Sequence, residues 1–145
     1  YTNREIAEMF GKTFEVPSGP DSGGAVVIKD ISVFSYCEHH MALMYDMKVD
    51  VAYVPRGRVL GLSKIARICD MAAKRLQLQE RLGRDIAEII SLAALSPDVG
   101  VRIEGCHSCM TSRGIKNVSS KTVTKTYFGA FKNDLSLQNL LGDRV

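Results

Sequence analysis

The chain has 145 residues, of which 46% are hydrophobic and 24% charged, and its formal net charge is +3. These values are typical of a globular domain and exclude a disordered or collagen-like chain, and the charge is too small to indicate nucleic acid as the main partner. The longest apolar runs are only a few residues, so the sequence predicts neither a membrane span nor a secretory signal. We expect one domain over residues 1–145, and the initial Tyr1 suggests that a natural N-terminal extension is missing.

The first half of the chain is predicted to contain one helix and two strands. Apolar spacing predicts a helix over Asn3–Phe14, and the residues Pro17–Gly24 form a loop rich in chain-breaking residues. Strands are predicted at Ala25–Ile31 and Met41–Val54, followed by a turn at Pro55–Arg58.

The second half is predicted to contain two helices, then two strands and a short terminal helix. Ser63 is the expected N-cap of a helix whose apolar stripe runs from Ile65 to Leu76, and Gln79 or Glu80 opens the next helix. Strands follow at Val99–Ile103 and Lys121–Phe131, and an amphipathic helix lies around Leu135–Leu141. Grouped strands and grouped helices predict an α+β fold, a four-stranded antiparallel sheet with the helices on one face. Such a sheet exposes two edges, which favours a homo-oligomer.

Two short clusters contain all three histidines and three of the four cysteines. They are Cys37-Glu38-His39-His40 and Cys106-His107-Ser108-Cys109, about seventy residues apart. Thiolates and imidazoles are the ligands that Zn²⁺ prefers, and a catalytic site takes three of them and keeps one position open. A small structural zinc site or buried thiols remain the alternatives. Cys106 has the opposite strand parity to His107 and is left outside the site, and Cys69, inside a helical apolar stripe, is predicted to be core.

Three further groups could bind an anionic ligand. Ser63, Lys64 and Arg67 open a helix, where backbone N–H groups favour a phosphate, although a capped and solvated helix start explains them equally well. Glu80 could accept two N–H donors from a guanine edge or simply favour the helix dipole. Arg113 could add positive charge for a polyphosphate or serve only solubility.

Taken together, the motifs resemble GTP cyclohydrolase I, the zinc enzyme that begins pterin and tetrahydrofolate synthesis. The resemblance rests on ordered segments from about Val26 to Phe131, listed here: Cys37-Glu38-His39-His40, Val51–Pro55, Gly61–Lys64 with Arg67, Arg75–Leu82, His107–Met110, Arg113-Gly114 and Lys121–Thr124. It implies the tunnelling fold, in which the sheets of neighbouring subunits join into a barrel. It also implies a cytoplasmic decamer of two pentameric rings, with active sites between subunits and neither nucleic acid nor a membrane as partner.

The resemblance assigns roles to particular residues. Cys37, His40 and Cys109 resemble the zinc ligands, with an open position for the water that attacks C8 of GTP. His107 resembles the acid–base residue, with His39 as its partner, and Ser63 would help the ribose rearrange after formate is released. The implied product is 7,8-dihydroneopterin triphosphate. The substrate-binding residues implied are Glu80 and Gln79 for the guanine, and Lys64, Arg67, Arg113 and Arg4 for the triphosphate.

The segment Met41–Lys48 departs from the family pattern, with one extra residue and no glycine, and a β-bulge would absorb the extra residue. The ligand types accept Fe²⁺ as well as Zn²⁺. Two alternatives stay open beside the active enzyme: a paralogue that opens the ring of a related purine nucleotide, and a regulatory protein that only binds a nucleotide or pterin.

Overall fold

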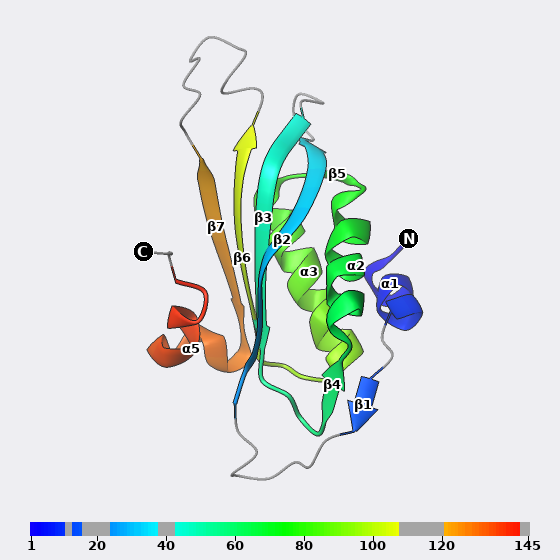
Figure 1. Ribbon diagram of the computed structural model, residues 1–145, viewed down its shortest axis with the longest axis vertical. Coiled ribbons are helices and arrows are strands. Elements are labelled where there is room, and N and C mark those ends of the chain that lie inside the picture. The colour runs from blue at the N-terminus through cyan, green and yellow to red at the C-terminus, as the bar shows by residue number, and fades with distance from the viewer. Residues whose placement is uncertain (11–12, 16–23, 38–42, 108–120, 143–145) are drawn as a thin grey trace.

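A five-stranded sheet forms the centre of the molecule (Figure 1). The computed structural model describes residues 1–10, 13–15, 24–37, 43–107 and 121–142. The strand order is β5-β2-β3-β6-β7, in which β2 to β7 pair antiparallel and the two-residue β5 pairs parallel to β2. The bounds are β2 Val26–Cys37, β3 Leu43–Tyr53, β5 Leu76–Gln77, β6 Val99–His107 and β7 Thr122–Phe128. The predicted α+β class and four antiparallel strands are confirmed.

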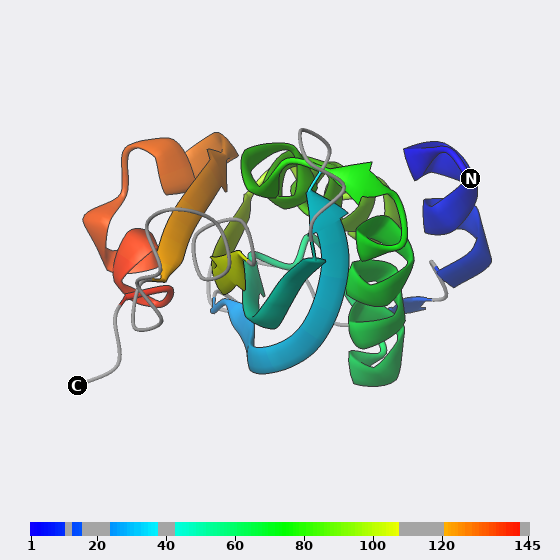
Figure 2. The same ribbon diagram turned by 90° about the horizontal axis from the view of Figure 1, so that it is seen from above.

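Two helices, α2 and α3, cover one face of this sheet, and a third, α1, packs on the outer side of these two (Figure 2). The three are α1 (Asn3–Phe10), α2 (Leu62–Ala73) and α3 (Gln79–Ala94), and α2 and α3 come between β3 and β6 in the chain, as predicted. Their apolar stripes pack with Val49, Val51 and Tyr53 of β3 in the main core. Cys69 lies in this core, as predicted, and its burial raises its thiol pKa to about 12. None of the helices in the described ranges is both long and apolar enough to span a membrane.

The opposite face carries a second, smaller apolar cluster near the C-terminus. Its buried members are Ala52, Phe131 and Leu141. The short helices η1 (Gly129–Lys132) and α5 (Leu135–Asn139) bring Phe131 and the C-terminal residues onto this face. Because side chains alternate along a strand, Ala52 packs here while its neighbours Val51 and Tyr53 pack against the helices.

Several predicted boundaries were wrong. The first helix ends at Phe10, and Thr13–Glu15 forms β1, which pairs antiparallel with β4 (Arg58–Leu60), where we had predicted a turn through Arg58. Leu76 belongs to β5 and not to the helix before it. The strand predicted to end at Ile31 continues to Cys37, because β3 offers it pairing partners along its length.

Three shifts adjust the register of the central strands, one of them between Val33 and Ser35 of β2. Between Tyr45 and Lys48 the pairing of β3 with β6 shifts by one residue, which is how the extra residue of the Met41–Lys48 segment was expected to be absorbed. Met41 itself lies outside the described residues. The third shift, between Ile28 and Ile31 of β2, contains Asp30 at φ 64°, whose amide donates to Asp50 Oδ1 over 2.9 Å.

Candidate active site

The sheet brings the two cysteine and histidine clusters to the same end. Cys37 is the last residue of β2 and His107 the last residue of β6, and β3 lies between these strands. The register fixes this placement, since Tyr36 pairs with Leu43 and the next residue of β3, Met44, pairs with His107. Segments about seventy residues apart in sequence therefore leave the sheet from neighbouring positions.

Most of the predicted metal ligands lie outside the described residues. These ligands are His40 and Cys109. His39 of the predicted acid–base pair and Arg113 of the triphosphate clamp also lie outside the described residues. Of Cys37 and His107 only the backbone is described. The donor set fits zinc, because two thiolates and one imidazole attached to one end of a sheet are of the kinds that Zn²⁺ binds in tetrahedral sites with an open position.

The start of α3 lies at the same end of the sheet as Cys37. The residues just before it form β5, in which Gln77 pairs with Cys37 and Leu76 with Tyr36. Glu80 is exposed in the first turn of α3, two residues after its N-cap, Leu78. The predicted guanine anchor is thus available to a ligand near the cluster end of the sheet.

Gln79, the other predicted guanine contact, is buried. Only 2% of its surface is exposed, and its amide Nε2 lies 3.1 Å from Ile103 O, 2.9 Å from Thr122 O and 3.2 Å from Thr124 Oγ1. The side chain therefore bridges α3 to β6 and β7 on the helix-covered face.

Charged side chains on the other face also join β6 to the start of β7. Arg102 Nη1 donates to Glu104 Oε1 over 3.0 Å, and Lys121 Nζ lies 3.4 Å from Glu104 Oε2. The hydrogen bond from Arg102 is the main cause that lowers the pKa of Glu104; burial opposes it and Lys121 adds to it. Lys121 is half exposed, so solvent screens its contribution. Gln79 and Glu104 together hold the two strands that flank residues 108–120, where Cys109 and Arg113 lie.

The first turn of α2, with Ser63 and Lys64, lies at the opposite end of the molecule, and Arg67 lies halfway along this helix. Helix α2 begins just after β4 and runs toward β5, so its twelve residues separate its first turn from the cluster end by about 18 Å (Figure 1). Ser63 and Arg67 are exposed and Lys64 is half-buried. Ser63 is not the N-cap that we predicted, because Gly61 takes that position without any side-chain cap, and Ser63 is the second residue of the helix.

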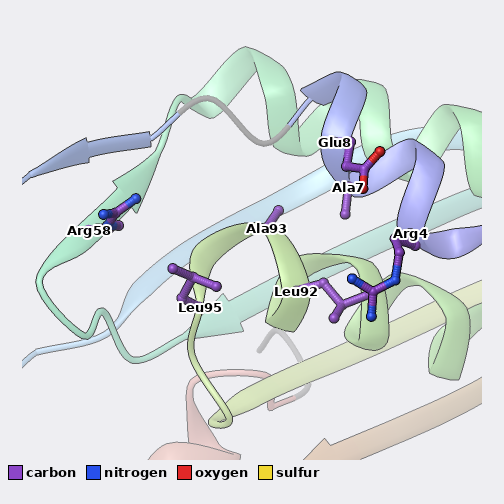
Figure 3. A pocket seen from close by; sticks show the side chains of 7 residues that line it. All are labelled: Arg4, Ala7, Glu8, Arg58, Leu92, Ala93 and Leu95. Atoms are coloured by element: carbon purple, nitrogen blue, oxygen red, sulfur yellow. The ribbon is translucent and has the colours of Figure 1, made fainter.

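Arg4 lines a pocket of about 320 Å³ between α1, β4 and the C-terminal end of α3. Figure 3 shows Arg4 on one side of this pocket and Arg58 on the other, with Leu92, Ala93 and Leu95 between them and Glu8 on α1. Neither guanidinium forms an ion pair with any residue that the structure describes. Sequence reasoning missed Arg58, because it looked like part of a turn. From Gln79 to Ala93, α3 spans about 20 Å, which separates this pocket from the cluster end.

The predicted site residues therefore form two groups. The cluster end carries Cys37, His107, Gln79 and Glu80. The far end carries Ser63, Lys64 and the pocket that Arg4 lines, and Arg67 lies between the two ends, halfway along α2. No group of three metal-ligating side chains occurs among the residues that the structure describes. One copy of the chain does not bring the cations of the far end to the cluster end.

Comparison with known proteins gives a consistent family. A family model described as GTP cyclohydrolase I matches residues 1–144. The chain is 62% identical over 145 residues to GTP cyclohydrolase 1 of Ruminiclostridium cellulolyticum, an alignment covering 97% of this chain and 73% of that protein. It is 57% identical over 143 residues to GTP cyclohydrolase 1 of Clostridium beijerinckii, with the same coverage.

Among solved structures, the apo form of the archaeosine synthase QueF-Like is similar in fold. The TM-score is 0.57 at 21% sequence identity, and the match covers 78% of this chain and 98% of that one. This similarity concerns the arrangement of sheet and helices alone, and it agrees with the tunnelling fold that the sequence implied.

Proposed function

The chain belongs to the GTP cyclohydrolase I family, and we propose that it hydrolyses GTP at C8 of the guanine, releases formate and forms 7,8-dihydroneopterin triphosphate. The observation that carries this proposal is the convergence of the two ligand clusters at the ends of β2 and β6, beside the start of α3. This reaction would be the first step of pterin and tetrahydrofolate synthesis. We propose a cytoplasmic location, where GTP is present as substrate.

In this proposal Cys37, His40 and Cys109 hold a zinc ion, with Fe²⁺ as the alternative metal that the same ligands accept. When bound, the metal supplies a Lewis acid that lowers the pKa of water and so provides a nucleophile near neutral pH. The support from this chain is the chemistry of the donors and the strand ends from which the two donor segments leave the sheet.

The remaining residues of the cluster end handle protons and the purine. His107 donates a proton to the ring nitrogen as the imidazole ring of guanine opens, with His39 as its partner, since an imidazole titrates near neutral pH. The exposed carboxylate of Glu80 accepts hydrogen bonds from the guanine edge, with Gln79 beside it.

The far end supplies the triphosphate clamp and acts on the substrate of another subunit. Lys64, Arg67 and Arg4, joined by Arg113, neutralise the triphosphate, and Ser63 assists the rearrangement of the ribose. Because Ser63 and Lys64 lie about 18 Å from the cluster end of their own chain and the pocket that Arg4 lines lies about 20 Å from it, a complete site needs the cluster end of one copy and the far end of the next. We therefore propose a ring-forming homo-oligomer, a decamer of two pentameric rings, with GTP bound between subunits.

The decisive measurement is anaerobic incubation of the metal-loaded protein with GTP, with formate and pteridine absorbance followed together. Formate with a pteridine is the expected result. Formate alone would mean that the ring opens but the ribose does not rearrange, which would implicate Ser63 and favour a ring-opening paralogue. Neither product from a metal-loaded protein would contradict the proposal and favour a regulatory binding protein.

The proposed roles of the second cluster predict opposite effects on the metal. His107→Ala should retain one metal per subunit and lose nearly all turnover, because a proton donor is removed and no ligand is. Cys109→Ser should lose the metal together with turnover. Metal analysis of both dialysed variants beside the wild type checks this, and metal loss from His107→Ala would show that its imidazole is a ligand.

A further inference from the structure

Gln79 combines deep burial with an amide that satisfies acceptors on two strands. The three acceptors of its Nε2 are the carbonyl oxygens of Ile103 on β6 and Thr122 on β7, and the hydroxyl of Thr124 on β7. Its exposed fraction is 2%. A buried amide that donates to acceptors on both strands is costly to remove, because its loss leaves polar groups without their partner away from water.

The position of these acceptors in the sheet matters. Ile103 pairs with Thr124 and Gly105 pairs with Thr122, so Gln79 bridges the last paired residues of β6 and β7. Residues 108–120 belong to the connection between these two strand ends. Gly105 lies against this side chain: a Cβ there would be 3.6 Å from Gln79 Oε1, an ordinary contact distance, whereas it would be only 2.9 Å from Met47 Cγ, so the glycine leaves space for Met47.

Gln79 is also the first residue of α3, and Glu80 follows it. The bridge therefore ties the exposed carboxylate of Glu80 to the end of β6, which continues through His107 to Cys109. A change in how α3 sits on β6 and β7 would move Glu80 relative to His107 without removing either side chain.

We infer that Gln79 is a positioning residue of the proposed reaction, which fixes Glu80 relative to the end of β6 and does not itself contact the nucleotide. This inference rests on the proposed function. It differs from the direct guanine contact that the sequence resemblance implied, because the amide nitrogen already serves acceptors within its own subunit.

The test compares Gln79→Met, Thr124→Val and the double variant in the metal-loaded oligomer, with GTP as the probe. Methionine keeps the length of the side chain but cannot donate. We expect Gln79→Met to lower kcat by about tenfold to a hundredfold, as a small misplacement of reacting groups does, with KM for GTP changed by less than about threefold. Thr124→Val should have a small effect alone and none once residue 79 is Met, because both changes remove the same contact.

Gln79→Glu adds a readout that a purely structural role would not move. Its carboxylate cannot donate to the two carbonyl oxygens, whereas its protonated form can donate one hydrogen bond. Relative to the wild type, the kcat of this variant should therefore recover as the pH is lowered, which shifts the acidic limb of its pH–rate profile.

Gln138→Met is the matched control. Gln138 Nε2 also donates to a backbone carbonyl, that of Phe131, over 2.8 Å, but it does so on the opposite face of the sheet. This variant should lower Tm and leave kcat unchanged.

The inference is overturned if Gln79→Met raises KM for GTP at constant kcat, or if it lowers Tm alone as Gln138→Met does. It is also overturned if Gln79→Met and Thr124→Val act additively on kcat. A wild type that turns over no GTP contradicts the proposed function, and the positioning role with it. If the wild type is active but the variants do not behave as expected, the positioning role alone is contradicted.

Discussion

Asp98 shows how one buried carboxylate joins three connections of the fold. It is 4% exposed just before β6, its Oδ1 accepts from the Ala130 amide over 2.8 Å, and its Oδ2 pairs with Arg56 of the β3–β4 connection. Burial alone would raise its pKa. The hydrogen bond from Ala130 and the pairing with Arg56 outweigh burial and hold the pKa below its ordinary value of 3.8.

Replacing Asp98 by Asn should therefore destabilise the fold in a pH-dependent way. A carboxyl whose pKa is lowered by folding stabilises the folded state above its unfolded pKa, and this contribution is lost as the pH falls through the folded pKa. We expect Asp98→Asn to lower the free energy of unfolding by about 1–3 kcal/mol at neutral pH, with a smaller difference from the wild type below about pH 3.8. Urea unfolding at fixed protein concentration and several pH values measures this.

Glu88→Gln is the control for the Asp98 substitution, since Glu88 is an exposed carboxylate of α3. Its effect on the free energy of unfolding should be small at every pH. An Asp98→Asn difference that is constant from neutral to acid pH would mean that the charge of Asp98 does not contribute.

At the scale of the elements, Gly100 decides how closely the C-terminal segment approaches the sheet. A Cβ there would lie 2.6 Å from Leu141 Cδ1 and 2.7 Å from Phe131 Cδ2, both fully buried side chains. Glycine in β6 thus lets Phe131 and Leu141 pack directly on the backbone beside Ala52.

Gly100→Val should push η1 and α5 away from the sheet. We expect a loss of about 1–3 kcal/mol in the free energy of unfolding from overpacking, with faster proteolysis after residue 128. Gly24→Ala is the matched control, because a Cβ at Gly24 meets nothing within 4 Å. Equal stability of Gly100→Val and the wild type would show that this cluster repacks without cost.

At the scale of the whole molecule, the separation of the two residue groups makes the subunit arrangement part of the chemistry. In the ring that we propose, each site takes its metal ligands from one subunit and the cations Lys64 and Arg4 of the triphosphate clamp from another. The open edges of the sheet fit such an arrangement: in the part of the chain that the structure describes, β7 pairs with β6 alone.

Mixed oligomers test this arrangement directly. His107→Ala subunits keep an intact far end and Lys64→Ala subunits keep an intact cluster end, so their co-expression should restore activity. With random mixing in equal amounts, about a quarter of the shared sites receive an intact cluster end and an intact far end. The mixture should therefore have about a quarter of wild-type activity, well above the activity of either parent variant. GTP turnover of oligomers purified through two different tags measures this.

The control is a mixture of His107→Ala with Cys109→Ser, which damages the same end in both subunits and should restore nothing. Mixed oligomers of the first pair with no more activity than the mean of their parents would mean that each site lies within one subunit.

The sequence by itself determined the class of fold and the order of its main elements. Apolar spacing placed α2 and α3 between β3 and β6, and it identified Cys69 as core, because burial of an apolar stripe is a local property of the residues that form it. The ordered motifs from about Val26 to Phe131 also indicated the family before any coordinates, because several motifs in one order are far more specific than any one of them alone.

Only the tertiary structure decided which of these residues lie together. Strand register, a property of pairs of segments, brought Cys37 and His107 to one end, and it turned Thr13–Glu15 and Leu76-Gln77 into strands that local propensity did not predict. The direction in which α2 runs across the sheet placed Ser63 and Lys64 at the other end. Gln79 was predicted to contact guanine, and only the packing showed that its amide is buried against β6 and β7. Burial depends on residues that are distant in sequence and become neighbours only in the folded chain.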